Sequence, residues 1–432
     1  MTDTSIFPPR VGPDLLRALE SQIDVQAEAR EMIPVVAPFT GDVIGHIPEA
    51  NEADVVAAVA KARRAQEDWK LLSPKMRGRV LTKFHDLLLD RSDQAIDIPQ
   101  LEGGKARVAS MEEVFDTAAT ARYYVNTAPK LLRRHRRAVS FPGFSSAHEY
   151  HHPVGVVGFI SPWNFPFVLG VGDAIPALLA GNGVVLKPDE KTPYSTLFAV
   201  SLLREAGVPD GLVQVLTGRG EKVGPLLIDN VDYVMFTGST AVGRLVAEQA
   251  GRRLIGSSLE LGGKNAAIVL ADVDLDRAIP EISRSVFANA GQLCIAMERI
   301  YVEESIVPEF TSRFVEHVGG LRVASGYDYS SDLSALITTE HLDNVQHHVE
   351  DAVAKGAALL AGGKPRPDVG PTFFEPTVLT DVDESMLLCR TETFGPVVSV
   401  YPTPNADAAV ESANDSEYGL NFSVWTSDVR RG

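Results

Sequence analysis

Gly155-Val-Val-Gly-Phe-Ile160 is followed by an apolar helical pattern over 168–180 and by a second apolar run, Gly183-Val-Val-Leu-Lys187. Runs that are apolar throughout and bounded by Gly or Pro are typical of parallel strands covered on both faces. The alternation continues to about residue 259, with strands predicted at 212–216 and 233–236 and helices at 193–206, 222–228 and 241–250. This pattern predicts a Rossmann-type doubly wound α/β sheet, in which ligands bind at the carboxyl ends of strands.

A second α/β unit is predicted to begin after Glu260. Its apolar runs predict strands at 266–270, 300–302 and 397–401, and its helical patterns predict helices at 275–289, 307–318 and 342–355. The chain before residue 153 differs, because short strands at 35–38 and 42–47 are predicted to precede helices at 51–67 and 74–92 and one or two more helices over 102–128. The last of these helices is predicted to end before Pro129. This leading part contains no recognisable chemistry.

The composition is that of a globular protein and argues against two classes of partner. The chain has 432 residues, enough for two or three domains, of which 45% are hydrophobic and 22% charged. Its formal net charge of −17 disfavours binding to nucleic acid or to an anionic membrane surface. The short basic run 131–137 is therefore interpreted as a solvated helix end.

Cysteine content and apolar segments indicate the compartment. The chain has two cysteines, which cannot form a disulfide framework, so a reducing cytoplasm is expected. Residues 1–10 lack a basic region followed by an apolar core, so no signal peptide is predicted. The apolar region 154–186 is interrupted by Pro, Asn and Asp, so we interpret it as strand, loop, helix and strand rather than as a membrane span.

Cys294 is the candidate nucleophile. It lies in the stretch Phe287-Ala-Asn-Ala-Gly-Gln-Leu-Cys294-Ile-Ala, between a helical pattern and the strand-like run 299–302. A thiol in a loop between rigid elements, with small neighbours, is open to a substrate. The alternative is a buried inert cysteine, which is the commoner fate of a lone Cys and is our interpretation of Cys389.

A phosphate site is predicted at a turn in the first α/β unit. No Gly-x-Gly-x-x-Gly sequence follows a strand, but the strand at 233–236 leads into Thr237-Gly-Ser-Thr-Ala-Val-Gly243 and a helix. Free N–H groups and the helix dipole favour an anion there, although Gly-Ser also caps many ordinary helices. At the end of another strand, Lys187 and Glu190 fit either contacts to ribose hydroxyls or an exposed charged turn.

Four motifs, in this order, resemble those of the aldehyde dehydrogenase superfamily. They are Ser161-Pro-Trp-Asn-Phe-Pro166, Leu259-Glu-Leu-Gly-Gly-Lys264, Gly291-Gln-Leu-Cys294 and Glu392-Thr-Phe-Gly-Pro396. The resemblance covers the chain from about residue 37 to its last residue. It implies an aldehyde dehydrogenase-like fold and NAD(P)-dependent oxidation of an aldehyde to its carboxylic acid, through a cysteine thiohemiacetal and thioester.

The resemblance also implies the roles of three catalytic residues. Cys294, as thiolate, attacks the aldehyde carbon, and the side-chain amide of Asn164 stabilises the oxyanion together with the backbone N–H of Cys294. Glu260 is the general base for hydrolysis of the thioester, a role that suits a partly buried carboxylate with a raised pKa. Its presence favours hydrolysis over transfer to coenzyme A. Without the resemblance, each residue has a structural alternative: Asn164 is also compatible with an Asx turn, and Glu260 with the charged end of a strand.

NAD is the implied cofactor, with NADP as the alternative. In the family, Lys187 contacts a ribose, Ser239 contacts the phosphates and Glu392 binds the nicotinamide ribose, while Phe394 packs near the ring. An acid at Glu190 disfavours a 2′-phosphate by charge repulsion. The implied cofactor-binding set is Trp163, Lys187, Pro188, Asp189, Glu190, Gly238, Ser239, Thr240, Gly243, Leu261, Glu392 and Phe394.

The implied architecture has three parts. They are a dinucleotide-binding domain at 1–133 and 153–258, a β-arm at 134–152 that pairs with a neighbouring subunit, and a catalytic domain at 259–432. A homo-oligomer and a small-molecule aldehyde are therefore the expected partners. Three arm histidines (His148, His151 and His152) are interpreted as surface residues, since no second cluster completes a metal site. Because family members continue beyond residue 432, a C-terminally truncated chain is expected.

Local sequences are similar to those of actinobacterial-type succinate-semialdehyde dehydrogenases, notably Gly251-Arg-Arg-Leu-Ile-Gly and Phe374-Glu-Pro-Thr-Val-Leu. Better-known enzymes of that activity hold the substrate carboxylate with two arginines, at positions occupied here by Gly172 and Ala288. A carboxylate without a guanidinium is poorly paired in a semi-buried tunnel. The alternatives are therefore a dehydrogenase of neutral aliphatic or aromatic aldehydes, or an inactive truncated remnant that only binds dinucleotide.

Overall fold

A computed structural model describes residues 6–25 and 30–432, so the stretch inspected for a signal peptide lies partly outside the described residues. The chain divides into two compact units. Unit 1 comprises the described residues of Met1–Val36, Val43–Glu102 and Ser110–Glu260, and unit 2 comprises Ala37–Asp42, Gly103–Ala109 and Leu261–Gly432. Unit 2 therefore includes 37–42 and 103–109, which the sequence assigns to the dinucleotide-binding domain. Hydrogen bonds tie both segments to unit 2: the hydroxyl of Thr372 donates to the carbonyl of Pro38, and the N–H of Ala335 donates to the carbonyl of Gly104.

Unit 1 contains the predicted doubly wound sheet. Its strands are β5 (Val156–Ile160), β6 (Gly183–Lys187), β7 (Val213–Val215), β8 (Tyr233–Thr237) and β9 (Gly256–Glu260). They are parallel and lie in the order β7-β6-β5-β8-β9, so the order reverses between β5 and β8. β5 and β6 are buried at every position, which explains their apolar runs.

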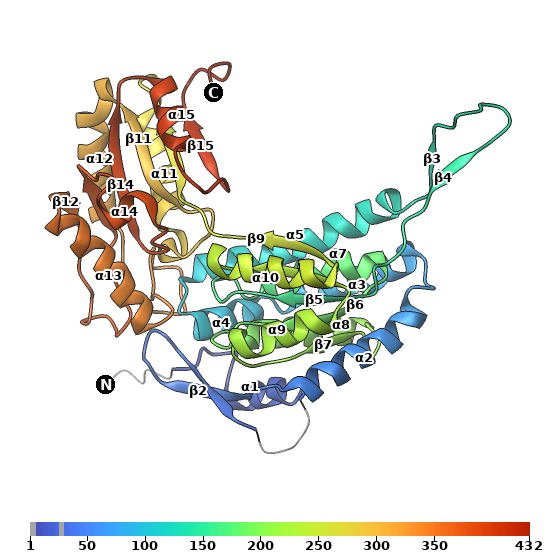
Figure 1. Cartoon of the computed structure of the whole chain (residues 1–432). Helices are drawn as coiled ribbons and strands as arrows, with labels where there is room; N and C mark the ends of the chain where they lie inside the picture. The colour runs from blue at the N-terminus through green and yellow to red at the C-terminus, as the bar shows by residue number, and fades with distance from the viewer. Residues whose placement is uncertain (1–5, 26–29) are drawn as a thin grey trace. The chain divides into compact units, whose positions relative to one another are not determined.

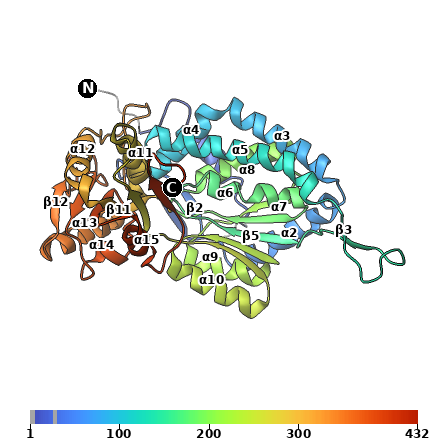
Figure 2. The same cartoon turned by 90° about the horizontal axis from the view of Figure 1, so that it is seen from above.

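Helices cover both faces of this sheet. Figure 2 shows α9 (Gly220–Asn230) and α10 (Thr240–Arg253) along one face, and α7 (Ala174–Ala180) and α8 (Pro193–Ala206) along the other. The prediction of one helix over 168–180 is wrong, because α6 (Val168–Val171) and α7 are separate. In one continuous helix the ring of Pro176 would clash with the carbonyl of Gly172, four residues earlier. The helix is therefore interrupted before α7.

The leading part of the chain adds helices and a hairpin to unit 1. Its elements are α1 (Pro13–Glu20), β1 (Met32–Val36), β2 (Val43–Pro48), α2 (Glu52–Trp69), α3 (Pro74–Asp90), α4 (Ser92–Gly103) and α5 (Arg107–Leu131). Most of α4 was not predicted, and α5 continues past Pro129, where helix 102–128 was expected to end. Pro129 lies in the last turn of a 25-residue helix, so its missing N–H removes a hydrogen bond only near the end.

The predicted arm is a hairpin of β3 (His135–Arg137) and β4 (Ala147–Glu149), which projects from the helices of unit 1 (Figure 1). Three residue pairs hold its strands together, and Arg137 forms an ion pair with Glu149 across them. Phe144 at its tip is 95% exposed.

Unit 2 is built on a second sheet in the order β12-β13-β14-β11-β10-β15. Its strands are β10 (Asn265–Val269), β11 (Met297–Glu303), β12 (Ala358–Ala361), β13 (Thr377–Thr380), β14 (Val397–Thr403) and β15 (Phe422–Trp425), and its helices are α11 (Leu275–Phe287), α12 (Val307–Gly319), α13 (Thr339–Ala354), α14 (Leu387–Arg390) and α15 (Ala406–Asn414). β12 is antiparallel to β13, and the other neighbours are parallel.

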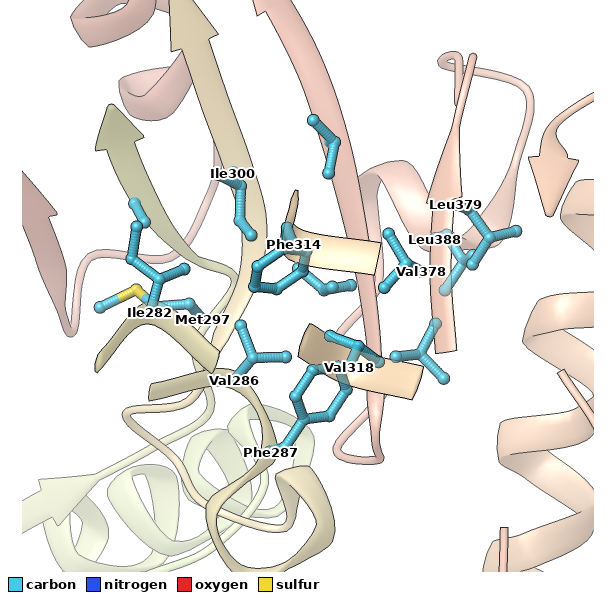
Figure 3. Packing of buried hydrophobic residues seen from close by; sticks show 14 of the residues in the cluster. Ile282, Val286, Phe287, Met297, Ile300, Phe314, Val318, Val378, Leu379 and Leu388 are labelled. Carbon is cyan, nitrogen blue, oxygen red and sulfur yellow. The ribbon is translucent and has the colours of Figure 1, made fainter. Parts of the chain in front are cut away.

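The core of unit 2 fixes the two helices that flank β11. Figure 3 shows Phe287 and Val286 of α11 facing Phe314 and Val318 of α12. The rings of Phe287 and Phe314 stack with centroids 6.5 Å apart. Each ring that is removed from water contributes about 2–3 kcal/mol, so the end of α11, which leads to Cys294, is firmly placed.

No helix among the described residues is long and apolar enough to cross a membrane.

A fully buried carboxylate fixes the start of α8. Glu102 accepts hydrogen bonds from the N–H groups of Tyr194 (2.7 Å) and Ser195 (2.8 Å), in the first turn of that helix. Burial raises the pKa of Glu102 to about 8. The folded chain therefore retains a proton on this group at pH values where the unfolded chain has lost it.

Glu102→Gln should flatten the pH dependence of stability. The folded pKa of Glu102 is raised, so between about pH 4.5 and pH 8 the folded state binds more protons and the free energy of unfolding falls as pH rises. In urea unfolding at pH 6 and pH 8, wild type should lose about 2–3 kcal/mol more than the variant. Glu52→Gln, at an exposed carboxylate, is the control. Equal losses in wild type and E102Q would contradict this account.

Candidate active site

The loop that carries Cys294 has an unusual backbone. After α11 ends, Asn289 (φ 51°), Ala290 (φ 54°) and Gly291 (φ 73°) are all left-handed. The prediction that the helix continues to residue 289 is therefore wrong by two residues. A left-handed conformation costs a residue such as Ala290 about 1–2 kcal/mol, so the surroundings must hold it. The chain then turns to Cys294, whose side chain is partly buried, and enters β11.

The side chain of Gln292 holds the loop from one side. Gln292 is 1% exposed, and its Nε2 donates to the carbonyls of Asn289 (3.1 Å) and Ala335 (3.2 Å). Its Oε1 accepts from the N–H of Ile337 at 2.9 Å. One amide thus ties the left-handed turn to the segment 335–337.

Asn265, the first residue of β10, holds the loop from the other side. Its Nδ2 donates to the carbonyls of Cys294 and Ala296, both at 2.8 Å. Its Oδ1 accepts from the N–H of Asn421 (3.0 Å), whose own Nδ2 donates to the carbonyl of Ile295 (3.0 Å). Three consecutive carbonyls around the thiol are therefore fixed by side-chain amides. Sequence reasoning missed Asn265 and Asn421, although Asn265 directly follows the quoted Leu259–Lys264 motif.

Gly262 and Gly263 bring Glu392 and the thiol loop to the same stretch of backbone. The N–H of Gly263 donates to Glu392 Oε1 at 2.9 Å. A Cβ on Gly262 would lie 2.4 Å from Glu392 Oε2, and one on Gly263 would lie 2.9 Å from the carbonyl oxygen of Cys294. Both contacts are closer than a side chain allows, so this approach requires glycine.

Glu392 is partly buried, and this burial raises its pKa to about 7. The nearby charge of Glu298 acts in the same direction, whereas the N–H of Gly263 and the charge of Lys264 oppose it. Phe394, two residues later, has a left-handed backbone (φ 55°), and its carbonyl lies 2.7 Å from His341 Nε2. Unit 2 thus brings together Leu261, Cys294, Glu392 and Phe394 of the predicted set.

In unit 1, the predicted phosphate turn lies at the end of β8. The N–H of Gly238 donates to the carbonyl of Glu260 at 3.0 Å, which pins the turn to the end of β9. Ser239 caps α10, because its Oγ accepts from the N–H of Val242 at 3.4 Å. Thr240 and Gly243 follow in the first turn of this 14-residue helix. The result is a helix start at the carboxyl edge of the sheet, which suits an anion.

Lys187, the last residue of β6, is 2% exposed, and its Nζ lies 3.4 Å from Glu190 Oε2. Lys191 lies 3.3 Å from Asp189 and 3.5 Å from Glu190. Burial opposes ionisation of Glu190, but the charges of Lys187 and Lys191 outweigh it and hold its pKa below the ordinary value. A Cβ on Gly220, at the start of α9, would lie 3.7 Å from Lys187 Nζ, so the ammonium sits beside a helix start that the sequence did not single out.

The remaining predicted residues of unit 1 lie at the carboxyl ends of its strands. Asn164 is 4% exposed, and the carbonyl of Trp163 accepts from the hydroxyl of Thr192 at 3.5 Å. Glu260 ends β9 and is exposed, which corrects the expectation of a partly buried carboxylate. It lies at the last residue of an edge strand, where few side chains cover it. Burial and the charge of Glu260 both raise the pKa of Asp173.

No group of three or more metal-ligating side chains occurs in the part of the chain that the structure describes. On the arm, the rings of His135 and His151 lie 5.9 Å apart, and His151 Nε2 lies 3.5 Å from Glu149.

These two groups of residues suit different tasks. Unit 2 presents a thiol on a fixed loop and a carboxylate that approaches the same Gly262-Gly263 backbone as that loop, which suits covalent chemistry on a hydroxyl-bearing ligand. Unit 1 presents a helix start, a buried ammonium and an ionised carboxylate at the strand ends, which suits phosphates and ribose hydroxyls.

Gly262→Ala should weaken binding of the expected dinucleotide by about tenfold or more. The added methyl group would overlap Glu392 Oε2 and force that carboxylate from its position. Isothermal titration with NAD measures the effect. Gly251→Ala is the matched control, because a Cβ there meets nothing within 4 Å. Unchanged affinity in G262A would show that Glu392 does not contact the ligand.

Comparisons with known proteins place this geometry in a family. The model of the aldehyde dehydrogenase family matches residues 25–432. A putative succinate-semialdehyde dehydrogenase [NADP(+)] of Mycolicibacterium smegmatis is 50% identical over 417 residues, covering 96% of this chain and 80% of the relative. A probable succinate-semialdehyde dehydrogenase [NADP(+)] of Sinorhizobium fredii is 37% identical, covering 97% of this chain and 86% of the relative.

Solved structures agree with the fold. An aldehyde dehydrogenase from Brucella melitensis biovar abortus matches with a TM-score of 0.90 at 31% identity, covering 100% of this chain and 87% of that one. Betaine aldehyde dehydrogenase from Staphylococcus aureus, in complex with NAD+, matches with a TM-score of 0.91 at 30% identity, covering 97% and 85%. The fold, the motifs and these matches together show that the chain belongs to the aldehyde dehydrogenase family, whose members are oxidoreductases acting on aldehydes.

Proposed function

We propose that this chain oxidises an aldehyde to its carboxylic acid with NAD or NADP, and that succinate semialdehyde is the aldehyde. One observation supports this reaction type above the others. The loop that holds the Cys294 thiol and the carboxylate of Glu392 both lie against the backbone of Gly262-Gly263. The thiol supplies the nucleophile, and the carboxylate supplies an acceptor for a ribose hydroxyl.

Each catalytic residue has a stated role in this proposal. The Cys294 thiolate bonds to the aldehyde carbon, while the amide of Asn164 and the N–H of Cys294 donate to the oxyanion. A bound nicotinamide supplies the hydride acceptor that this oxidation requires. Glu260 then removes a proton from the water that hydrolyses the Cys294 thioester. Its exposed position at the end of β9 leaves it accessible to water.

In each unit, the predicted residues suit one part of a dinucleotide. Gly238, Ser239, Thr240 and Gly243 would hold its phosphates at the start of α10, with Trp163, Pro188, Asp189 and Leu261 lining the site. Lys187 and Glu190 would hold the adenosine ribose, because they present a donor and an acceptor 3.4 Å apart. Glu392 and Phe394 would hold the nicotinamide end. The ionised Glu190 disfavours a 2′-phosphate, which supports NAD, whereas relatives at 50% and 37% identity are named for NADP.

The names of the relatives support succinate semialdehyde as the substrate. A neutral aldehyde is the second candidate, and the side chains at two positions favour it. Gly172 has no side chain, and a Cβ there would lie 2.4 Å from the carbonyl oxygen of Val168. Ala288 opens the turn before Cys294 and has no charge. Neither position offers a guanidinium to a distal carboxylate.

We also propose that 1–133 and 153–258, apart from 37–42 and 103–109 that belong to unit 2, form the dinucleotide-binding domain, and that 259–432 form the catalytic domain. In this proposal the hairpin at 134–152 is an oligomerisation arm. The projecting β3–β4 hairpin with an exposed Phe144 supports this role, because an isolated two-stranded hairpin gains stability by pairing.

Two variants separate acylation from deacylation. Cys294→Ser should abolish NAD(P)H formation and retain dinucleotide binding, whereas Glu260→Gln should accumulate an acyl-enzyme that mass spectrometry detects on Cys294. Cys389→Ser is the control and should turn over normally, since burial raises the pKa of that thiol and makes it a poor nucleophile. Turnover by C294S at the wild-type rate would refute the mechanism.

The same assay identifies the substrate. Succinate semialdehyde, a neutral aliphatic aldehyde and benzaldehyde are each offered with NAD and with NADP. A higher kcat/KM for succinate semialdehyde supports the proposal, and a higher value for a neutral aldehyde supports the second candidate. Dinucleotide binding without turnover of any aldehyde would indicate a chain that only binds the cofactor.

Glu190→Gln should shift cofactor use toward NADP. Removing this carboxylate ends its repulsion of a 2′-phosphate and breaks the ion pair of Lys187, while Lys191 keeps its ion pair with Asp189. The ratio of kcat/KM for NADP to that for NAD should rise about tenfold or more. Glu248→Gln, an exposed carboxylate on α10, is the control for net charge. An unchanged ratio would contradict the placement of Glu190 at the 2′ position.

A further inference from the structure

Glu298, the second residue of β11, is a buried carboxylate that no motif of the chain accounts for. It is 5% exposed and forms an ion pair with Lys264, whose side chain is 1% exposed. A buried charge is costly unless it is paired and hydrogen-bonded, and Glu298 meets both conditions. Its remaining contacts are with the backbone of the segment that contains Glu392.

Two consecutive N–H groups point at this carboxylate. The N–H of Thr393 lies 3.0 Å from both oxygens of Glu298, and the N–H of Phe394 lies 2.9 Å from Oε1. Consecutive N–H groups that converge on an anion form a strong binding arrangement, because hydrogen bonds to a charged acceptor are strong. The anion here belongs to the chain itself.

This clamp acts on a turn that needs support. Phe394 has a left-handed φ of 55°, which a residue with a side chain adopts only when its surroundings enforce it. Other contacts hold the same turn: His341 Nε2 lies 2.7 Å from the carbonyl of Phe394, and His348 Nδ1 lies 3.1 Å from Thr393 Oγ1. Glu298 is the charged member of this set and holds both backbone amides.

We propose that Glu298, with Lys264 as its charge partner, is a positioning residue that holds the Glu392–Phe394 turn in the conformation that binds the nicotinamide end of the dinucleotide. The inference rests on the proposed function, because it assigns Glu392 and Phe394 to the cofactor. Glu298 itself touches neither substrate nor cofactor in this account. Its effect should therefore appear in cofactor binding and in the order of the turn.

Glu303 provides a matched control on the same strand. It is 8% exposed, accepts from the N–H of Ala271 at 2.6 Å and pairs with Arg431 at 2.8 Å. It therefore has the same kind of structural role at the other end of β11, away from the Glu392 turn. A variant that only destabilises unit 2 should behave like Glu303→Ala.

The test compares E298A, E303A and the pair E298Q/K264M in the full chain, by isothermal titration with NAD and by hydrogen exchange of the amides of 392–395. E298A should weaken NAD binding at least tenfold and raise exchange in the turn, while E303A leaves both at wild-type values. In E298Q/K264M, the Gln oxygen still accepts from the turn and its NH2 faces an uncharged Met. That pair should recover affinity to within about threefold of wild type.

The outcomes separate the two proposals. If E298A binds NAD as wild type does, or if E303A loses as much affinity, the positioning role is overturned and the proposed function stands. If E298A lowers kcat without raising the KM for NAD, Glu298 acts on the chemical step and the inference is overturned. If wild type binds neither NAD nor NADP, the proposed function fails, and the inference fails with it.

Discussion

Buried carboxylates that accept hydrogen bonds from loop amides are the constraint on which both units depend. A backbone N–H that leaves a helix or strand and is buried must find an acceptor. In unit 1, Glu102 accepts a hydrogen bond from the first turn of α8, and Glu113 accepts one from the N–H of Phe167, directly after the motif that contains Asn164. In unit 2, Glu298 accepts hydrogen bonds from the N–H groups of Thr393 and Phe394. These acids therefore hold the segments to which we assign function.

The same arrangement explains why the acids differ in protonation. Where burial outweighs the nearby hydrogen-bond donors and positive charges, the pKa of the carboxylate rises, as for Glu102 at about 8 and Glu392 at about 7. Where lysines are close, their charge outweighs burial and the pKa falls, as for Glu190. If Glu392 accepts from a ribose hydroxyl as we propose, it binds best when deprotonated, and its raised pKa makes that binding favourable above neutral pH. Glu190 remains ionised across this range.

The sequence predicted the fold of unit 1 well and the site only in part. Strands buried on both faces, such as β5 and β6, carry a continuous apolar run that identifies them. β9 and β15 were missed because their burial is low or alternating and no apolar run marks them. Motif residues such as Cys294 were named as candidates from the sequence alone. Asn265 and Glu298 were not, because their partners are backbone groups 29 to 96 residues away, and only the folded chain brings them together.

The strained turn before Cys294 shows how these constraints combine. The left-handed conformation is costly for Ala290, so contacts with other parts of unit 2 must hold the turn. Gln292 offsets part of this cost, because its side chain forms hydrogen bonds both to Asn289 and to the segment 335–337. Asn265 stabilises the loop further by donating to the carbonyls of Cys294 and Ala296. Gly291 is needed because a Cβ there would lie 2.0 Å from the carbonyl oxygen of Gly395, beside the Phe394 turn. The thiol loop and the Glu392 turn thus pack backbone against backbone, so neither can move without displacing the other.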